Sequence, residues 1–205
     1  DELAHNIKIL RECLNDNAKF LGVCKANAYG HGMIEIAKKL QSCGADWLAV
    51  ATIPEGIELR ENNISLPILC LGQTRPEFAE LMSDYNISQA VGDLENGREL
   101  SRILESAKKK INIHVKIDTG MSRTGFYWPD DKASQEKTAR EIYELCTLPN
   151  IEPEGMFTHF ATADDDPEFT RLQLRKFNQA RYALSKLGIN FKIYHAAASV
   201  GVLNY

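Results

Sequence analysis

The stretch VCKANAYGHG, residues 23–32, begins at the end of an apolar run and passes straight into a lysine, Lys25. A charged group directly after a buried strand is costly unless it faces solvent, pairs with another charge or takes part in chemistry. Lys25 is therefore either a solvated lysine at the end of a strand or a Schiff-base lysine. The residues after it favour a ligand site, because they combine hydrogen-bonding side chains with glycines that let the backbone bend closely: Asn27, Tyr29, His31, Gly30 and Gly32.

Around this stretch, short apolar runs alternate with amphipathic helical segments along the whole chain. Seven runs are predicted strands: residues 20–25, 47–51, 67–72, 87–91, 111–118, 154–160 and 191–197. The helical segments are predicted at residues 5–14, 33–43, 54–62, 75–85, 94–110, 132–146 and 167–188. Alternation of this kind is typical of parallel strands joined by helical crossovers, and nearly continuous apolar runs are typical of strands buried on both faces.

Two α/β architectures fit this alternation: a doubly wound open sheet and a TIM (β/α)8-type barrel. Polar residues lie at the ends of several different strands, namely Lys25, Lys116, Asp118, His159 and His195. A barrel gathers all its strand ends around one mouth, whereas an open sheet usually has a glycine-rich first turn that is missing here. We therefore expect a barrel, truncated after about seven strands, that forms one domain over residues 1–205.

The composition excludes several classes of protein. The chain of 205 residues is 44% hydrophobic and 25% charged, with a net charge of −4 and no basic stripe, so nucleic-acid binding has little support. No apolar run is long enough to span a membrane. The five cysteines are scattered without a CxxC pair, which indicates reduced thiols and a cytoplasmic protein.

The motif at residues 23–32 resembles the cofactor-lysine motif of the alanine racemases, which are fold-type III pyridoxal-phosphate enzymes. Three further stretches resemble motifs of the same family in the same order: HVKIDTGMSRTGF (114–126), EGMFTHFATADD (154–165) and YHAAASVGVLNY (194–205). The resemblance covers essentially the whole chain. It implies a pyridoxal 5'-phosphate cofactor, no metal, and an amino-acid racemase that interconverts L- and D-alanine.

The resemblance also implies roles for individual residues. Lys25 would hold the cofactor and act as one of two acid–base groups, while Tyr29 and Ser199 would contact its phosphate. Arg123 would lie beside its phenolic oxygen, oriented by Lys116, a lysine that the family often carries as a carbamate. His159 would pack against the pyridine ring, Val23 and Leu71 would line the ring pocket, and His195 would support an arginine at the pyridine nitrogen.

Simpler interpretations remain open for several of these residues. Lys116 and Asp118 could form an exposed ion pair, which contributes little to stability. Arg123 could be a surface residue in a loop bounded by glycines. His159 could be a core histidine, and Ser199 could be the N-cap of a helix, which is compatible with phosphate binding.

Two departures from the family pattern concern cofactor binding and completeness. Ala198 stands where the family usually places an asparagine before the phosphate serine. The arginine at the pyridine nitrogen and the second base, a tyrosine from a C-terminal β domain of the other subunit, would lie beyond Tyr205. We therefore expect residues 1–205 alone to be inactive, and the intact protein to be a cytoplasmic homodimer that makes D-alanine for the cell wall.

Other functions fit parts of the same sequence. A racemase for serine or another small amino acid would share all four motifs. A pyridoxal-phosphate homeostasis protein would bind the cofactor without racemase activity, and a fold-type III decarboxylase would share the barrel and the lysine. A Schiff-base aldolase would use the lysine without a cofactor.

Overall fold

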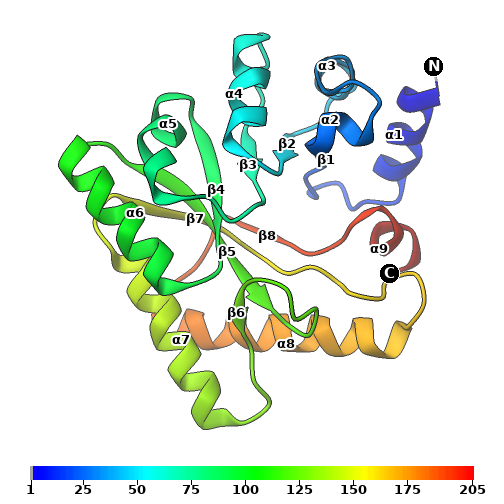
Figure 1. Ribbon diagram of the computed structural model, residues 1–205. Coiled ribbons are helices and arrows are strands. Elements are labelled where there is room, and N and C mark those ends of the chain that lie inside the picture. The colour runs from blue at the N-terminus through cyan, green and yellow to red at the C-terminus, as the bar shows by residue number, and fades with distance from the viewer. Residues whose placement is uncertain (1) are drawn as a thin grey trace. The chain divides into compact units, whose positions relative to one another are not determined.

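The computed structural model describes residues 2–205, which divide into two compact units with the boundary between Ala90 and Val91. Each unit is a series of parallel strands connected by helices. Figure 1 shows the elements of both units in chain order by colour. The predicted α/β class is confirmed.

The first unit contains four parallel strands in sequential order. They are β1 (Leu21–Val23), β2 (Trp47–Val50), β3 (Ile68–Cys70) and β4 (Ile87–Val91), paired in the order β1-β2-β3-β4. Its helices are α1 (Glu2–Glu12), α2 (Lys25–Tyr29), α3 (Met33–Ser42), α4 (Ile53–Glu61), η1 (Pro76–Phe78) and α5 (Ala79–Asp84). Along the chain, α1 packs on α3 and α3 packs on α4 (Figure 1).

The apolar strand residues form the core of this unit. Leu48, Val50, Ile68 and Leu69 have no exposed surface, as expected for strands covered on both faces. The strands pair in parallel, with Leu48 opposite Ile68.

The second unit pairs β5, β7 and β8 in that order. These strands are β5 (Ile111–Asp118), β7 (Ile151–Phe157) and β8 (Ile193–His195), and the short β6 (Phe126–Tyr127) pairs with the end of β5. Its helices are α6 (Leu94–Ala107), α7 (Lys132–Thr147), α8 (Pro167–Lys186) and α9 (Ser199–Asn204). Helix α7 packs on α6, α8 and β7 (Figure 1).

Aspartates fix where the three long helices of the second unit begin. The side chains of Asp93, Asp131 and Asp166 accept hydrogen bonds from the amides of Asn96, Ser134 and Phe169, at 2.8, 2.9 and 2.9 Å. Such N-caps satisfy backbone N–H groups that have no partner within the helix.

Several predicted boundaries are corrected by the structure. The predicted strand 154–160 is β7, Ile151–Phe157, so His159 lies two residues beyond the strand. The predicted helix 94–110 ends at Ala107, because Lys108 adopts a left-handed conformation with φ of 55°. The predicted helix 75–85 is divided into η1 and α5.

Candidate functional site

The turn after β1 holds Lys25 in an unusual backbone. Four successive non-glycine residues, Ala26 to Tyr29, have positive φ values between 51 and 56°, so α2 is a single left-handed turn. L-residues disfavour this conformation by about 1–2 kcal/mol each. Strain of this kind persists where the surrounding structure enforces it, and it is concentrated at functional sites.

Contacts from other parts of the first unit hold both ends of this turn. Before Lys25, the amide of Cys24 donates to the carbonyl of Ala49 at 2.8 Å. After Lys25, the amide of Ala26 donates to Glu55 Oε1 at 2.8 Å. Within the turn, Asn27 Oδ1 accepts the amide of Met33, the first residue of α3, at 2.8 Å.

Glu55 is a residue of this site that the sequence interpretation missed. The spacing of Thr52 and Glu55 is a capping-box signature, and both hydrogen bonds of the box are present at the start of α4. That signature predicts a role in α4 alone. The contact with Ala26 bridges 29 positions of the chain, so it becomes visible in the folded structure.

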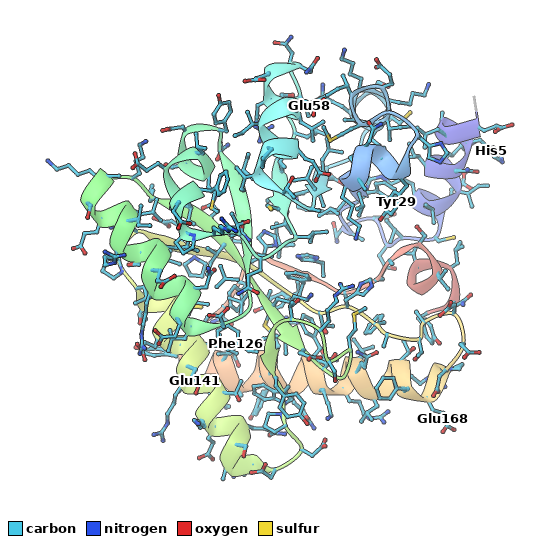
Figure 2. The ribbon with its side chains drawn as sticks, viewed as in Figure 1. His5, Tyr29, Glu58, Phe126, Glu141 and Glu168 are labelled. Atoms are coloured by element: carbon cyan, nitrogen blue, oxygen red, sulfur yellow. The ribbon has the colours of Figure 1, made fainter. Side chains whose placement is uncertain are left out.

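Lys25 and Tyr29 lie on the same turn with their polar groups available. The Lys25 amine is 5.9 Å from the centre of the Tyr29 ring. Lys25 is half-buried, and Tyr29 is 63% exposed on α2 (Figure 2). Within residues 2–205, neither side chain makes a hydrogen bond or an ion pair.

Cys24, directly before Lys25, is a buried thiol. Burial, with a smaller contribution from the Glu55 carboxylate, raises the pKa of Cys24 to about 11. A thiol with this pKa is almost entirely protonated near neutral pH and is a poor nucleophile. The Lys25 amine therefore has no competing thiolate directly before it in the chain.

The two predicted ring-pocket residues lie at the carboxyl ends of their strands. Val23 is the last residue of β1, and Leu71 directly follows β3, where its amide donates to the carbonyl of Val50 at 2.8 Å. Both are half-buried. Their placement agrees with a site at the carboxyl ends of the strands of this unit.

In the second unit, Lys116 is buried inside β5 at 7% exposure. Its amine donates to Thr124 Oγ1 at 2.6 Å. Asp118 is 8% exposed, and its Oδ1 accepts the amides of Gly120 and Ser122, both at 3.0 Å. The alternative of an exposed ion pair between Lys116 and Asp118 is therefore wrong, since both residues are buried.

Arg123 lies in the loop after β5. Asp118 holds the start of this loop through its backbone amides, and Lys116 holds the end through Thr124. Ser122, before Arg123, has φ of 56°, and Gly125, after it, has φ of 125°. Arg123 is exposed, and its guanidinium makes no hydrogen bond or ion pair with the rest of the described chain. The structure thus gives Arg123 a well-defined loop and an unused cation.

His195 ends β8 in a cluster of rings. It stacks on Phe157 with centroids 4.7 Å apart, and its Nε2 is 2.8 Å from Nδ1 of the buried His114. Burial, followed by the charge of His114, lowers the pKa of His195 to about 3. His195 is therefore neutral near pH 7.

His159 is half-buried in the segment after β7, where its backbone carbonyl accepts a hydrogen bond from Gln173 Nε2 at 3.2 Å.

Ser199 is the first residue of α9 rather than its N-cap. The N-cap is Ala198, which has no side chain that could accept a hydrogen bond from the helix. Ser199 is exposed, and its hydroxyl has no partner among the residues described. The alternative that Ser199 caps the helix is wrong.

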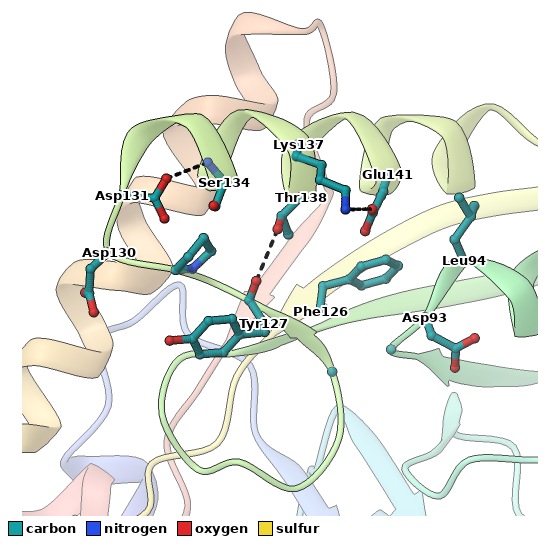
Figure 3. Close-up of a pocket in the computed structure, with 13 residues that line it drawn as sticks. Asp93, Leu94, Phe126, Tyr127, Asp130, Asp131, Ser134, Lys137, Thr138 and Glu141 are labelled. Atoms are coloured by element: carbon teal, nitrogen blue, oxygen red, sulfur yellow. Dashed lines mark hydrogen bonds and ion pairs between the residues drawn. The ribbon is translucent and has the colours of Figure 1, made fainter.

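A pocket of about 720 Å3 on the second unit lies apart from these candidate residues. It is bordered by the start of α6, by β6 and by the start of α7 (Figure 3). Several of its polar groups already have partners, such as Thr138, whose hydroxyl donates to the Tyr127 carbonyl at 3.3 Å. None of the residues predicted from the sequence to form the site lines this pocket.

The predicted residues therefore form two groups, one in each unit. The first unit brings Lys25 and Tyr29 onto one turn, with Val23 and Leu71 at strand ends. The second unit brings Lys116 to the loop of Arg123. Polar side chains at the carboxyl ends of parallel strands are the arrangement found in α/β barrels of the TIM type.

The family follows from comparison with known proteins. The family model "Alanine racemase, N-terminal domain" matches residues 1–205, and the chain belongs to this family. It is 40% identical over 208 residues to alanine racemase 2 of Caldanaerobacter subterraneus subsp. tengcongensis, covering 100% of this chain and 52% of that protein. The chain spans about half the length of the curated relatives it matches.

Solved structures agree with this assignment. The fold is similar to that of alanine racemase from Clostridium difficile 630 in complex with cycloserine, with a TM-score of 0.91 and 40% identity over 98% of this chain and 54% of the other. It is also similar to a histidine racemase from Leuconostoc mesenteroides, with a TM-score of 0.77 and 25% identity over 97% and 56% of the two chains. The predicted TIM-barrel-type fold with seven strands is confirmed. Within residues 2–205, no helix is both long and apolar enough to cross a lipid bilayer.

Proposed function

We propose that the protein is a pyridoxal-phosphate-dependent amino-acid racemase that interconverts L- and D-alanine. Residues 1–205 are its cofactor-binding barrel domain, and a further part of the protein completes the active site. Membership of the alanine racemase family supports this function. The curated relatives in the comparison are 35–40% identical alanine racemases, which supports alanine as the substrate.

The observation that carries the proposal is a set of unused polar groups at the predicted positions. Within residues 2–205, the amine of Lys25, the phenol of Tyr29, the guanidinium of Arg123 and the hydroxyl of Ser199 have no hydrogen bonds. A strained turn carries the first two, and a fastened loop carries Arg123. A strained turn and a loop held by hydrogen bonds, both carrying polar side chains that make no hydrogen bonds within the chain, are typical of a ligand site.

This donor set fits pyridoxal phosphate. An amine can hold its aldehyde carbon, a phenol and a hydroxyl can donate to its phosphate, and a guanidinium can donate to its phenolic oxygen. We assign these contacts to Lys25, to Tyr29 with Ser199, and to Arg123. When bound, pyridoxal phosphate supplies an electron sink that makes the Cα proton of an amino acid easier to remove.

The residues of this chain would then bind the substrate and move a proton on one of its faces. The Lys25 amine takes a proton from the substrate Cα, or returns one, on the face where its turn lies. Inversion needs a second acid–base group on the opposite face. For that group we propose the tyrosine that the family resemblance implies, from another part of the intact homodimer.

Five other residues have supporting roles in this proposal. Lys116 orients the loop of Arg123 through its bond to Thr124. Neutral His195 can accept a hydrogen bond, which suits a partner such as a guanidinium that is a donor only. Val23 and Leu71 supply apolar contacts to the ring, and His159 a flat one. We also propose that the enzyme works in the cytoplasm, as its scattered thiols predict.

Chemical labelling of the full-length protein tests the central assignment. Borohydride reduction after incubation with pyridoxal phosphate, followed by peptide mapping, should place the pyridoxyl group on Lys25. The variant Lys25→Ala should lose the label and about 10²–10⁴-fold or more of the racemase rate with L-alanine. The matched variant Lys38→Ala changes an exposed lysine and should behave as the wild type.

Two outcomes would overturn the proposal. A label on Lys116, or no label at all, contradicts the role of Lys25. Rates with L-serine and L-histidine that exceed the rate with L-alanine contradict the substrate while leaving the cofactor site intact.

A further inference from the structure

The carboxylate of Glu55 makes two separate sets of contacts with its two oxygens. Oε2 accepts the amides of Ala51 and Thr52 at 2.7 and 3.1 Å, which fixes the connection from β2 to α4. Oε1 accepts the amide of Ala26 at 2.8 Å, which belongs to the turn after β1. One side chain thus connects the start of α4 to the turn that carries Lys25.

The contact with Ala26 satisfies a group that the turn itself cannot satisfy. The first N–H groups of a helical turn have no acceptor within the turn, whatever its hand. Later amides of this turn do find internal acceptors, since Ala28 donates to the carbonyl of Cys24 at 2.8 Å and Gly30 donates to that of Ala26 at 3.2 Å. The amide of Ala26 finds its acceptor in Glu55.

The peptide group before Lys25 is held through the carbonyl of Cys24, which accepts the amide of Ala28 at 2.8 Å, and the peptide group after Lys25 is held through the contact of Ala26 with Glu55. The two bonds set the direction in which the Lys25 side chain leaves the backbone. One of the two acceptors is a main-chain carbonyl that every sequence would supply. The other is a side chain, so it depends on the residue at position 55.

We propose that Glu55 is a positioning residue for Lys25, holding the left-handed turn so that the amine meets the cofactor in one orientation. The cofactor part of this inference rests on the proposed function. Glu55 acts through the backbone of Ala26 and does not itself take part in the proton transfer.

The use of both oxygens explains why a carboxylate is needed here. Glutamine has one acceptor oxygen, so one set of amides would face an NH2 group and lose its bond. Glu55→Gln should therefore release either the Ala26 amide or the pair at Ala51 and Thr52. Because the second pair belongs to the same short connection as Glu55 itself, we expect the distant bond to Ala26 to be lost.

Hydrogen–deuterium exchange on the full-length protein, without added cofactor, tests the hold on the turn. Peptides covering residues 24–32 should exchange about 10-fold faster in Glu55→Gln, as expected for the loss of one charge-assisted bond.

Two control variants separate this effect from simpler causes. Glu58→Gln makes the same chemical change on an exposed position of α4 (Figure 2). Thr52→Ala removes the other half of the capping box and leaves the Ala26 bond in place. Both controls should change exchange in this segment less than about 2-fold, although Thr52→Ala lowers the melting temperature.

Cofactor binding gives the second measurement. The dissociation constant for pyridoxal phosphate should rise about 10-fold or more in Glu55→Gln, because misplacing a reacting group is costly. The visible circular dichroism of the bound cofactor, which reports its orientation, should change in Glu55→Gln and in neither control.

The outcomes distinguish the inference from the function on which it rests. Unchanged exchange in Glu55→Gln overturns the role of Glu55, whatever the cofactor does. Faster exchange with unchanged affinity and dichroism shows a structural cap and overturns the positioning role. Failure of the wild type to form a label on Lys25 overturns the proposed function, and the exchange data still support or contradict the hold of Glu55 on the turn.

Discussion

The turn after β1 and the loop after β5 are each held by a carboxylate, but the two carboxylates do so in different ways. Each segment follows a buried strand, and in each a carboxylate accepts two or more backbone amides. In the turn, Glu55 comes from another element and uses both of its oxygens. In the loop, Asp118 is the last residue of the strand itself and uses one oxygen for the amides of Gly120 and Ser122.

The two segments also differ in which residues adopt the disfavoured backbone. In the turn, four non-glycine residues from Ala26 to Tyr29 have positive φ. In the loop, two of the residues with positive φ are glycines, with φ of 139° at Gly120 and 125° at Gly125. In the turn, Tyr29 is both a predicted site residue and a residue with positive φ, whereas Lys25 directly precedes the four residues with positive φ. In the loop, Arg123 itself has no positive φ, although Ser122 directly before it has φ of 56°.

The largest expected effect comes from adding a methyl group at a glycine of each segment. In Gly125→Ala, the new Cβ would lie 2.9 Å from the amide nitrogen of Asp118 and 3.0 Å from the carbonyl oxygen of Lys116. These backbone atoms cannot move aside without disturbing β5. We expect a loss of about 3 kcal/mol or more in the free energy of unfolding, from backbone strain and overpacking together.

Gly30→Ala provides the matched comparison. Gly30 also has a positive φ of 91°, but nothing lies within 4 Å of its added Cβ. We expect the conformational part alone, about 1–2 kcal/mol. Denaturant unfolding of both variants measures the difference. Equal losses would show that crowding at β5 contributes nothing, and that the loop is more adaptable than its contacts indicate.

Much of the fold could be predicted from the sequence because the strands are apolar and short. The strand at residues 111–118 is found with both of its predicted ends. The strand at 154–160 was misplaced by three residues, because Glu152 and Pro153 interrupt its apolar pattern. They are tolerated because the pairing with β5 shifts register between Ile113 and His114. Such a register shift depends on the neighbouring strand and leaves no signal in the local sequence.

The candidate site could be predicted less completely. The fastening of the loop by Asp118 has a local signal, since an aspartate before a glycine-containing segment favours an Asx turn. The left-handed turn at Lys25 has almost none, because alanine and tyrosine do not favour this conformation and asparagine does so weakly. It forms because Ala49, Glu55 and Met33 provide its hydrogen-bond partners from elsewhere in the first unit.

Two histidines, His31 beside the turn and His195 at the end of β8, allow an intermediate effect to be measured. His31 is exposed, whereas His195 is half-buried and its pKa is lowered from 6.5 to about 3, mainly by burial of the ring. The unfolded chain therefore binds a proton at His195 between these two pH values, and the folded chain does not. The contribution of His195 to stability is complete above pH 6.5 and is lost progressively as the pH falls below it.

We expect the free energy of unfolding to decrease by about 2 kcal/mol between pH 6.5 and pH 5 through His195 alone. Denaturant titrations at several pH values measure the slope. His195→Gln should remove this part of the slope, and His31→Gln should retain it. A slope that persists in His195→Gln would show that other groups cause the acid sensitivity.

The smallest expected effect compares the two carboxylates directly. In Asp118→Asn, the side-chain oxygen can still accept the amides of Gly120 and Ser122, because both bonds go to Oδ1. The second oxygen has no hydrogen bond within residues 2–205, so an amide nitrogen can take its place. Asp118→Asn loses only the charge assistance of the two bonds, which should cost about 1 kcal/mol in total.

Glu55→Gln should cost about 2–3 kcal/mol, because at least one backbone amide loses its acceptor. Unfolding of the two variants under identical conditions, with exchange of residues 24–32 and 119–125 followed in parallel, gives the comparison. If Asp118→Asn were as damaging as Glu55→Gln, the number of oxygens used would not explain the difference, and the charge itself would be what holds each segment.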